Sequence, residues 1–140
     1  MMIEIFLDAS YAIALSATTD RYHKLAEMLA MKIEAEGTRL VTTRAVVLEI
    51  GNALAKLRYR SASVTLLKAL EEDPSIEIIP LSEELYEKGW QLYRERVDKE
   101  WGLTDCISFI AMQEYGLTEA LTTDRHFEQA GFKVLLREKT

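Results

Sequence analysis

Apolar residues follow two alternating patterns along this chain, namely short continuous runs and longer segments in which they recur every three or four positions. The continuous runs are typical of buried β-strands and lie at residues 3–7, 39–41, 75–80, 119–123 and 132–136. The periodic segments predict helices at residues 9–15, 22–35, 43–59, 61–71, 82–98 and 104–115, with a further short helix from Asp124. Strands that alternate with helices form parallel sheets covered on both faces. The pattern therefore predicts an α/β fold, a three-layer α/β/α sandwich around a central, mainly parallel sheet.

Length and composition narrow the class of protein. With 140 residues, of which 49% are hydrophobic and 29% charged, the chain has the size and balance of one soluble domain spanning residues 1–140. The single cysteine, Cys106, has no internal disulfide partner, and Glu4 and Asp8 interrupt the apolar start, unlike in a signal peptide. No apolar run approaches the roughly 18 residues of a membrane helix. We therefore expect a cytoplasmic protein with no membrane segment, although a secreted protein without disulfides would have the same composition.

The net charge weighs against one class of function. A formal charge of −6 and a pI near 5.0 are unlike those of a protein that binds nucleic acid through a basic face alone. This objection weakens if several acidic side chains hold divalent cations, because the bound cations offset part of the negative charge. The acidic residues are therefore the first candidates for a functional site.

Four acidic residues lie beside apolar elements. Asp8 directly follows the first strand, and Asp124 follows the strand at 119–123. The carboxyl ends of parallel strands share one edge of a sheet, where ligands bind in this class of fold. Asp105 opens a helix that is apolar on nearly all sides, and Glu49 borders the apolar face of the long helix. Each acid alone is explained as readily by capping, the helix dipole or solvation, but the four together favour one shared site.

Carboxylates that meet at one edge repel one another and need a compensating cation. An all-oxygen set of ligands suits Mg²⁺ or Mn²⁺, whereas zinc is disfavoured because Cys106 and His126 show no zinc-ligand spacing. Two such ions about 4 Å apart would hold the attacking and leaving oxygens of a phosphoryl displacement and polarise the attacking water. The four acids therefore predict metal-dependent hydrolysis of a phosphodiester bond.

The chain resembles the PIN domain, and specifically the VapC-type ribonuclease toxins of toxin–antitoxin pairs, in the stretches FLDASYAIAL, TTRAVVLEIGNAL, LTDCISFIAM and LTTDRHFEQAGF. The resemblance spans the whole chain, and the order Asp, Glu, Asp, Asp at these separations is its specific part. It implies that Asp8, Glu49, Asp105 and Asp124 are catalytic and that they hold Mg²⁺ or Mn²⁺. It also implies that the substrate is RNA and that the fold is a PIN-like α/β/α sandwich.

Hydroxyl and basic side chains complete the expected site. Ser10 and Thr122 match hydroxyl positions of the family and would orient carboxylates or waters, although capping or turn roles explain them equally well. The candidates for RNA binding lie on the long helix and beside the last acid, and they are Arg44, Lys56, Arg58, Arg60 and Arg125. A simpler interpretation of the cluster around Tyr59 is that a helix C-terminus favours cations.

The resemblance also implies protein partners. We expect a homodimer and a small VapB-type antitoxin that lays a helix or strand across the site. Leu48, Ala55 and Tyr59 would form a second apolar patch on the long helix. The next helix, an identical subunit or the antitoxin would cover such a patch.

The sequence also allows alternative functions to be compared with a metal-dependent ribonuclease. A phosphatase with a nucleophilic aspartate would need a second acid two residues after Asp8, where Ser10 stands. A phosphoacceptor signalling domain would need an adjacent pair of acids near the first strand. The stronger alternatives are a housekeeping nuclease and a non-catalytic PIN-like RNA-binding module, and the module would be expected to lack one or more of the four acids.

Overall fold

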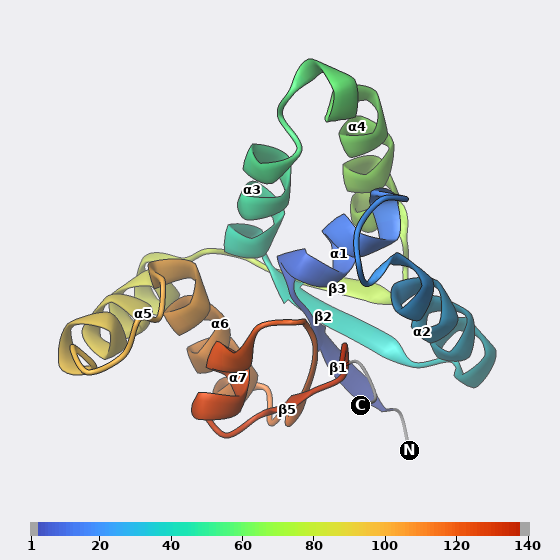
Figure 1. Ribbon diagram of the computed structural model, residues 1–140. Coiled ribbons are helices and arrows are strands. Elements are labelled where there is room, and N and C mark those ends of the chain that lie inside the picture. Colours follow the sequence, from blue (N-terminus) through green and yellow to red (C-terminus); the bar gives the residue numbers. More distant parts are fainter. Residues whose placement is uncertain (1–2, 138–140) are drawn as a thin grey trace.

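Five parallel strands form the centre of the fold. The computed structural model describes residues 3–137, and its sheet has the strand order β3-β2-β1-β4-β5 (Figure 1). The strands are β1 (Glu4–Leu7), β2 (Arg39–Thr43), β3 (Ile76–Ile79), β4 (Glu119–Leu121) and β5 (Lys133–Val134). Each pairing between these neighbours is parallel, which confirms the α/β fold that the sequence predicted.

Helices cover both faces of this sheet. Those on one face are α1 (Ala9–Ser16), α2 (His23–Glu36), α3 (Arg44–Ala53) and α4 (Leu57–Glu72). Those on the other face are α5 (Glu83–Glu95), α6 (Leu103–Glu114) and α7 (Arg125–Gln129). The chain runs outward from β1 to β3 and then crosses back beyond β1 to β4 and β5, and right-handed crossovers in opposite directions place their helices on opposite faces. Figure 1 shows the two groups on either side of the strands.

The helix predicted at 43–59 ends earlier than expected, and the next helix, predicted at 61–71, begins earlier. Helix α3 ends one residue before the buried Leu54, and α4 begins at Leu57. Within the bend, the Arg60 guanidinium donates a hydrogen bond to the Ala55 carbonyl, with a distance of 2.7 Å from Nη2. No proline or glycine marks the break, and the apolar spacing continues toward it, so the pattern alone does not reveal where the first helix ends.

This break corrects two expectations. Leu48 and Tyr59 lie on different helices, so with Ala55 they do not form one apolar patch on a single helix. Leu48 is exposed on α3, whereas Tyr59 is half-buried and packs against the core from α4. The basic cluster around Tyr59 lies at the start of α4, so its interpretation as the cations of a helix C-terminus is wrong.

Helix α6 is buried on most of its sides, as its apolar composition indicated. Cys106 is 0% exposed and Phe109 is 1% exposed. The Phe109 ring packs edge-to-face against Trp101 at a centroid distance of 5.0 Å and against Phe127 of α7 at 4.9 Å. This packing fixes the first turn of α6, where Asp105 lies, relative to α7.

Gly89 marks a close approach between α5 and α6. A Cβ atom at this position would lie 2.6 Å from Cγ1 of Ile107 and 3.1 Å from its Cα. Gly89→Ala should therefore lower the free energy of unfolding by about 1–3 kcal/mol through overpacking, although alanine favours a helix. In the matched control Gly51→Ala, the Cβ would lie 3.6 Å from Cδ1 of Leu67, so this variant should be up to about 1 kcal/mol more stable than the wild type. Urea unfolding measures both, and an equal effect of the two changes would contradict this packing.

Candidate active site

The carboxyl ends of β1 and β4 lie side by side where the chain reverses its direction across the sheet. Leu7 of β1 is in register with Leu121 of β4, and the Asp8 amide donates to the Leu121 carbonyl at 3.2 Å. The connections that follow these two strands lead to opposite faces, and a crevice forms at such a switch point. Asp8 therefore meets Thr122, which is 114 residues away along the chain.

A cavity of about 640 Å³ opens at this edge of the sheet. Its lining includes the four acids that the sequence singled out, Asp8, Glu49, Asp105 and Asp124. They come from the turn after β1, from α3, from the first turn of α6 and from the cap of α7. The fold thus brings together four carboxylates from four separate segments.

Two hydroxyl groups hold the buried carboxylate of Asp8. Thr122 Oγ1 donates to Asp8 Oδ2 at 2.7 Å, and Ser10 Oγ donates to the same oxygen at 3.1 Å. Each hydroxyl also accepts a backbone N–H at 3.0 Å, Thr122 from Asp124 and Ser10 from Thr123. Because a hydroxyl group has one proton to donate, these backbone contacts help to direct both protons toward Asp8.

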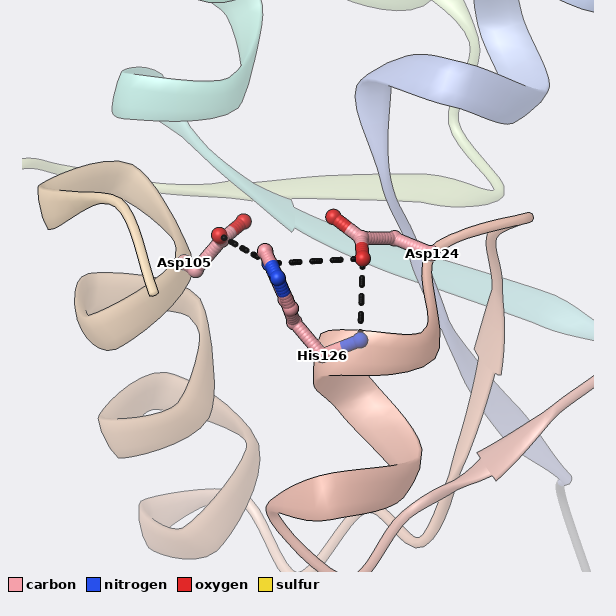
Figure 2. Close-up of side chains that lie close together, drawn as sticks. All are labelled: Asp105, Asp124 and His126. Atoms are coloured by element: carbon pink, nitrogen blue, oxygen red, sulfur yellow. Dashed lines mark hydrogen bonds and ion pairs between the residues drawn. The ribbon is translucent and has the colours of Figure 1, made fainter. Parts of the chain in front are cut away.

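Asp105, Asp124 and His126 form a close group, with the imidazole edge between the two carboxylates (Figure 2). His126 Nδ1 lies 3.3 Å from Asp105 Oδ2 and 3.3 Å from Asp124 Oδ1. Asp105 Oδ2 also accepts the Gly102 amide at 3.0 Å, and Asp124 Oδ1 accepts the His126 amide at 2.9 Å. Both acids therefore serve as helix caps as well. One ligand atom from each member of the group lies within 4.8 Å of the others, a spacing that a single metal ion can bridge.

His126 is a site residue that ligand spacing along the sequence does not reveal. Asp105, one of its two neighbours, comes from a different helix, so the group exists only in the folded chain. The available signal was its position two residues after Asp124, because the capping turn places the His126 amide against that carboxylate.

Three of the four carboxylates, Asp8, Glu49 and Asp105, lie in surroundings that disfavour their charged forms. Burial raises the pKa of Asp8, and the charge of Asp105 acts in the same direction, against the hydrogen bond from Thr122. Burial also raises the pKa of Glu49 to about 7, with further contributions from the charges of the other three acids. The pKa of Asp105 is raised by burial and by the charge of Asp124. These three side chains therefore bind protons more tightly than isolated carboxylates would.

These residues fit a hard divalent cation. They offer carboxylate oxygens, which are the ligands that Mg²⁺ and Mn²⁺ prefer, at a place where positive charge would relieve the repulsion. The fit rests on the donor set and on the raised pKa values. It agrees with the cation class expected from the sequence.

Basic residues lie at the cavity, at the start of α3 and around the α3–α4 bend. Arg125 lines the cavity together with Lys99, which the sequence pattern did not suggest. Arg44 forms an ion pair with Glu71 of α4. Arg58 lies over the ring of its neighbour Tyr59, with 4.7 Å between the guanidinium carbon and the ring centroid. The cavity lining includes Arg125 but not Arg44, Lys56, Arg58 or Arg60.

Comparisons with known proteins agree with this architecture. Mycobacterium tuberculosis VapC20, described as a toxin that cleaves the sarcin-ricin loop, superposes with a TM-score of 0.81 at 24% sequence identity, covering 91% of this chain and 95% of that one. Rickettsia felis VapBC2, bound to a fragment of promoter DNA, gives a TM-score of 0.67 at 13% identity over 94% of this chain and 96% of that one. PAE2754 from Pyrobaculum aerophilum gives 0.60 at 23% identity over 95% and 84% of the two chains. No curated protein matches the sequence.

Structural similarity at these identities shows a shared fold. The sequence itself matches the model of one family, described as the PIN domain, over residues 5–133. This match covers nearly the whole chain, including all four acids of the cavity. The chain therefore belongs to the PIN domain family.

Proposed function

We propose that this protein is a Mg²⁺- or Mn²⁺-dependent endoribonuclease and the toxin of a type II toxin–antitoxin pair. PIN domain proteins are in general nucleases, and VapC20, which shares this fold, is described as a toxin that cleaves the sarcin-ricin loop. The observation that carries the proposal is the gathering of four carboxylates from separate segments around one cavity. The raised pKa values of Asp8, Glu49 and Asp105 mean that a bound cation would stabilise the site.

Asp8, Asp105 and Asp124 would hold the cation, and Glu49 would orient a water or help to hold a second ion. A divalent cation bound there would supply positive charge to the phosphate and lower the pKa of the attacking water. Glu49 suits its role because it is half-buried on α3 and lines the cavity beside the other three acids.

Ser10 and Thr122 would position Asp8 rather than touch the substrate. Their hydroxyls bond the Asp8 carboxylate and are themselves held by backbone amides. Groups that orient a metal ligand in this way commonly contribute about 10–100-fold to metal affinity or activity.

Thr122→Val tests this positioning role, because it keeps the shape of the side chain and removes the hydroxyl. We expect cleavage to fall by about 10–100-fold and stability to fall by about 1–3 kcal/mol, since the Asp124 amide loses its acceptor. Thr42→Val is the control, because Thr42 is equally buried and its hydroxyl donates to the Leu7 carbonyl at 2.7 Å, not to an acid. Equal loss of cleavage in both variants would assign Thr122 a purely structural role.

The RNA backbone would meet basic residues at and beyond the cavity. Arg125 is exposed at the cavity and would contact the phosphate next to the cleaved bond. Lys56 and Arg58 are exposed near the α3–α4 bend and would contact phosphates further along the strand. We assign a smaller share to Arg44 and Arg60, which already pair with other groups of the protein.

The partners that we propose are a small VapB-type antitoxin and a second copy of this chain. The similarity to VapC20 and to VapBC2 supports the toxin assignment. Within residues 3–137, no helix is long and apolar enough to cross a membrane. Growth arrest on expression, relieved by Asp8→Asn, would separate a toxin from a housekeeping nuclease.

The experiment that tests the proposed chemistry is cleavage of an end-labelled structured RNA by the purified protein with Mn²⁺ or with EDTA. We expect cleavage in Mn²⁺ only, its loss in Asp105→Asn, and its retention in Asp98→Asn. Asp98 also lines the cavity but pairs with Arg96 at 2.9 Å, which makes it a matched control. Because water is the attacking group, a 2′-deoxy substitution at the cleaved position should leave cleavage intact. Binding of RNA without cleavage under any of these conditions would instead indicate a binding module.

A further inference from the structure

The His126 imidazole lies against the acidic cluster in a way that its helix-capping surroundings do not require. The capping of α7 uses the His126 amide and the Asp124 carboxylate, not the ring. Nδ1 of the ring forms a hydrogen bond with Asp105 Oδ2 at 3.3 Å and lies 3.3 Å from an oxygen of Asp124 (Figure 2). The ring is 30% exposed and lines the same cavity as the four acids.

We propose that Nδ1 of His126 is a direct ligand of the divalent cation, together with Asp105 and Asp124, and that it makes the site select Mn²⁺ over Mg²⁺. This inference rests on the proposed function, because it concerns the same cation. It adds a nitrogen to a site that is otherwise built from oxygen atoms. As a cation ligand, Nδ1 would carry no proton.

The distances between these atoms suit a shared cation. Neighbouring ligands of an octahedral ion with bonds of about 2.1 Å are about 3.0 Å apart, and opposite ligands are about 4.2 Å apart. The two distances from Nδ1 to carboxylate oxygens are both 3.3 Å, close to the value for neighbours. The three ligand atoms lie within 4.8 Å of one another, so a cation requires only small movements of the side chains.

The nitrogen ligand affects the choice between the two cations of the proposed function, Mn²⁺ and Mg²⁺. Both cations prefer oxygen ligands, but Mn²⁺, as a transition-metal ion, accepts an imidazole more readily than Mg²⁺, which retains several waters. A site with carboxylates and one imidazole should therefore favour Mn²⁺. His126→Gln should weaken Mn²⁺ binding by about 10-fold or more, with a smaller effect on Mg²⁺.

The chain contains two histidines, which allows a direct test of the bond. His23 is the control, because its Nδ1 lies 2.8 Å from the Ala14 carbonyl and its Nε2 lies 3.4 Å from Glu27 Oε1. Untagged full-length protein would be prepared with and without ¹⁵N-labelled histidine and loaded with Mn²⁺. Pulsed electron paramagnetic resonance then detects any nitrogen bonded to the ion.

We expect strong nitrogen coupling in the wild type and in His23→Gln, a change of the signal on ¹⁵N-histidine labelling, and its loss in His126→Gln. Bound Mn²⁺ without directly bonded nitrogen in the wild type would overturn the inference and leave the oxygen-only cation site of the proposed function standing. Failure of the wild type to bind Mn²⁺ would overturn the inference, and failure to bind either Mn²⁺ or Mg²⁺ would overturn the proposed function as well. The wild-type measurement decides the question even if the His126 variant folds poorly.

Discussion

Asp8→Asn should abolish RNA cleavage while making the metal-free protein more stable. The amide oxygen of asparagine can accept the same hydrogen bonds from Ser10 and Thr122, so the local structure should persist. The variant lacks the buried charge, which burial and Asp105 both disfavour. Since loss of a group that merely orients a ligand costs about 10–100-fold, loss of a ligand should lower the cleavage rate by more than about 100-fold. Cleavage assays in Mn²⁺ and thermal unfolding in EDTA measure the two effects.

The comparison of cleavage by Asp8→Asn and the wild type requires that the variant keeps the wild-type fold. Asp20→Asn is the control, because Asp20 Oδ1 accepts the Tyr22 amide at 2.8 Å and its side chain lies outside the cavity lining. This variant should cleave RNA at the wild-type rate. Cleavage by Asp8→Asn at a similar rate would show that Asp8 is a structural residue and would contradict its assignment to the cation.

The second large effect that we expect is a pH-dependent stabilisation by divalent cations. Glu49 has a pKa of about 7 in the folded protein, raised from 4.5, mainly because it is buried. A raised carboxyl pKa means that the folded state binds the proton more tightly than the unfolded state does. The contribution of Glu49 to the stability of the metal-free protein is therefore fully present below pH 4.5. This contribution is lost as the pH rises through about 7. The raised pKa values of Asp8 and Asp105 contribute in the same direction.

A cation should reverse this loss only where the carboxylates are charged. At pH 8, Mn²⁺ at about 100 times its dissociation constant should stabilise the fold by about 2.7 kcal/mol and raise Tm by roughly 10 °C. At pH 5 the increase should be much smaller, because protons compete for the same oxygens. Calorimetric scans with Mn²⁺ and with EDTA at both pH values measure the difference, and Glu49→Gln should flatten the metal-free pH profile. An equal Tm increase at pH 5 and pH 8 would argue against cation binding by this cluster.

The periodicity of apolar residues was sufficient to predict the layers of this fold. The run at 3–7 and the strand ending near Leu121 both proved to be parallel strands, and the switch-point rule placed their acids at one edge. The break between α3 and α4 was not predictable in this way. Leu57 continues the apolar spacing of α3 but is 94% exposed, because the chain turns at the buried Leu54. Burial of a side chain depends on contacts between distant segments, which periodicity does not report.

In the candidate site, too, some features were predictable from the sequence and others depend on contacts between distant segments. Asp8 and Asp124 follow strands, so their position was predictable from topology. Asp105 and Glu49 were placed only at the border of the apolar core, and the family resemblance strengthened their connection with the other two acids. His126 was missed as a member of the group because its contact with Asp105 is made only when α6 and α7 pack together. The family resemblance covered the acids and the two hydroxyls but implied nothing about this imidazole.

Incubation of a circular, structured RNA with the purified protein tests the central claim most directly, because a circle can be cut only by an endonuclease. The reaction would be followed with Mn²⁺ and then with EDTA. We predict that the wild type converts the circle to linear RNA in Mn²⁺, that EDTA stops the conversion, and that Asp8→Asn does not convert it. A circle that stays intact with the wild type while Mn²⁺ is bound at the cluster would contradict the assignment of this protein as a metal-dependent endoribonuclease.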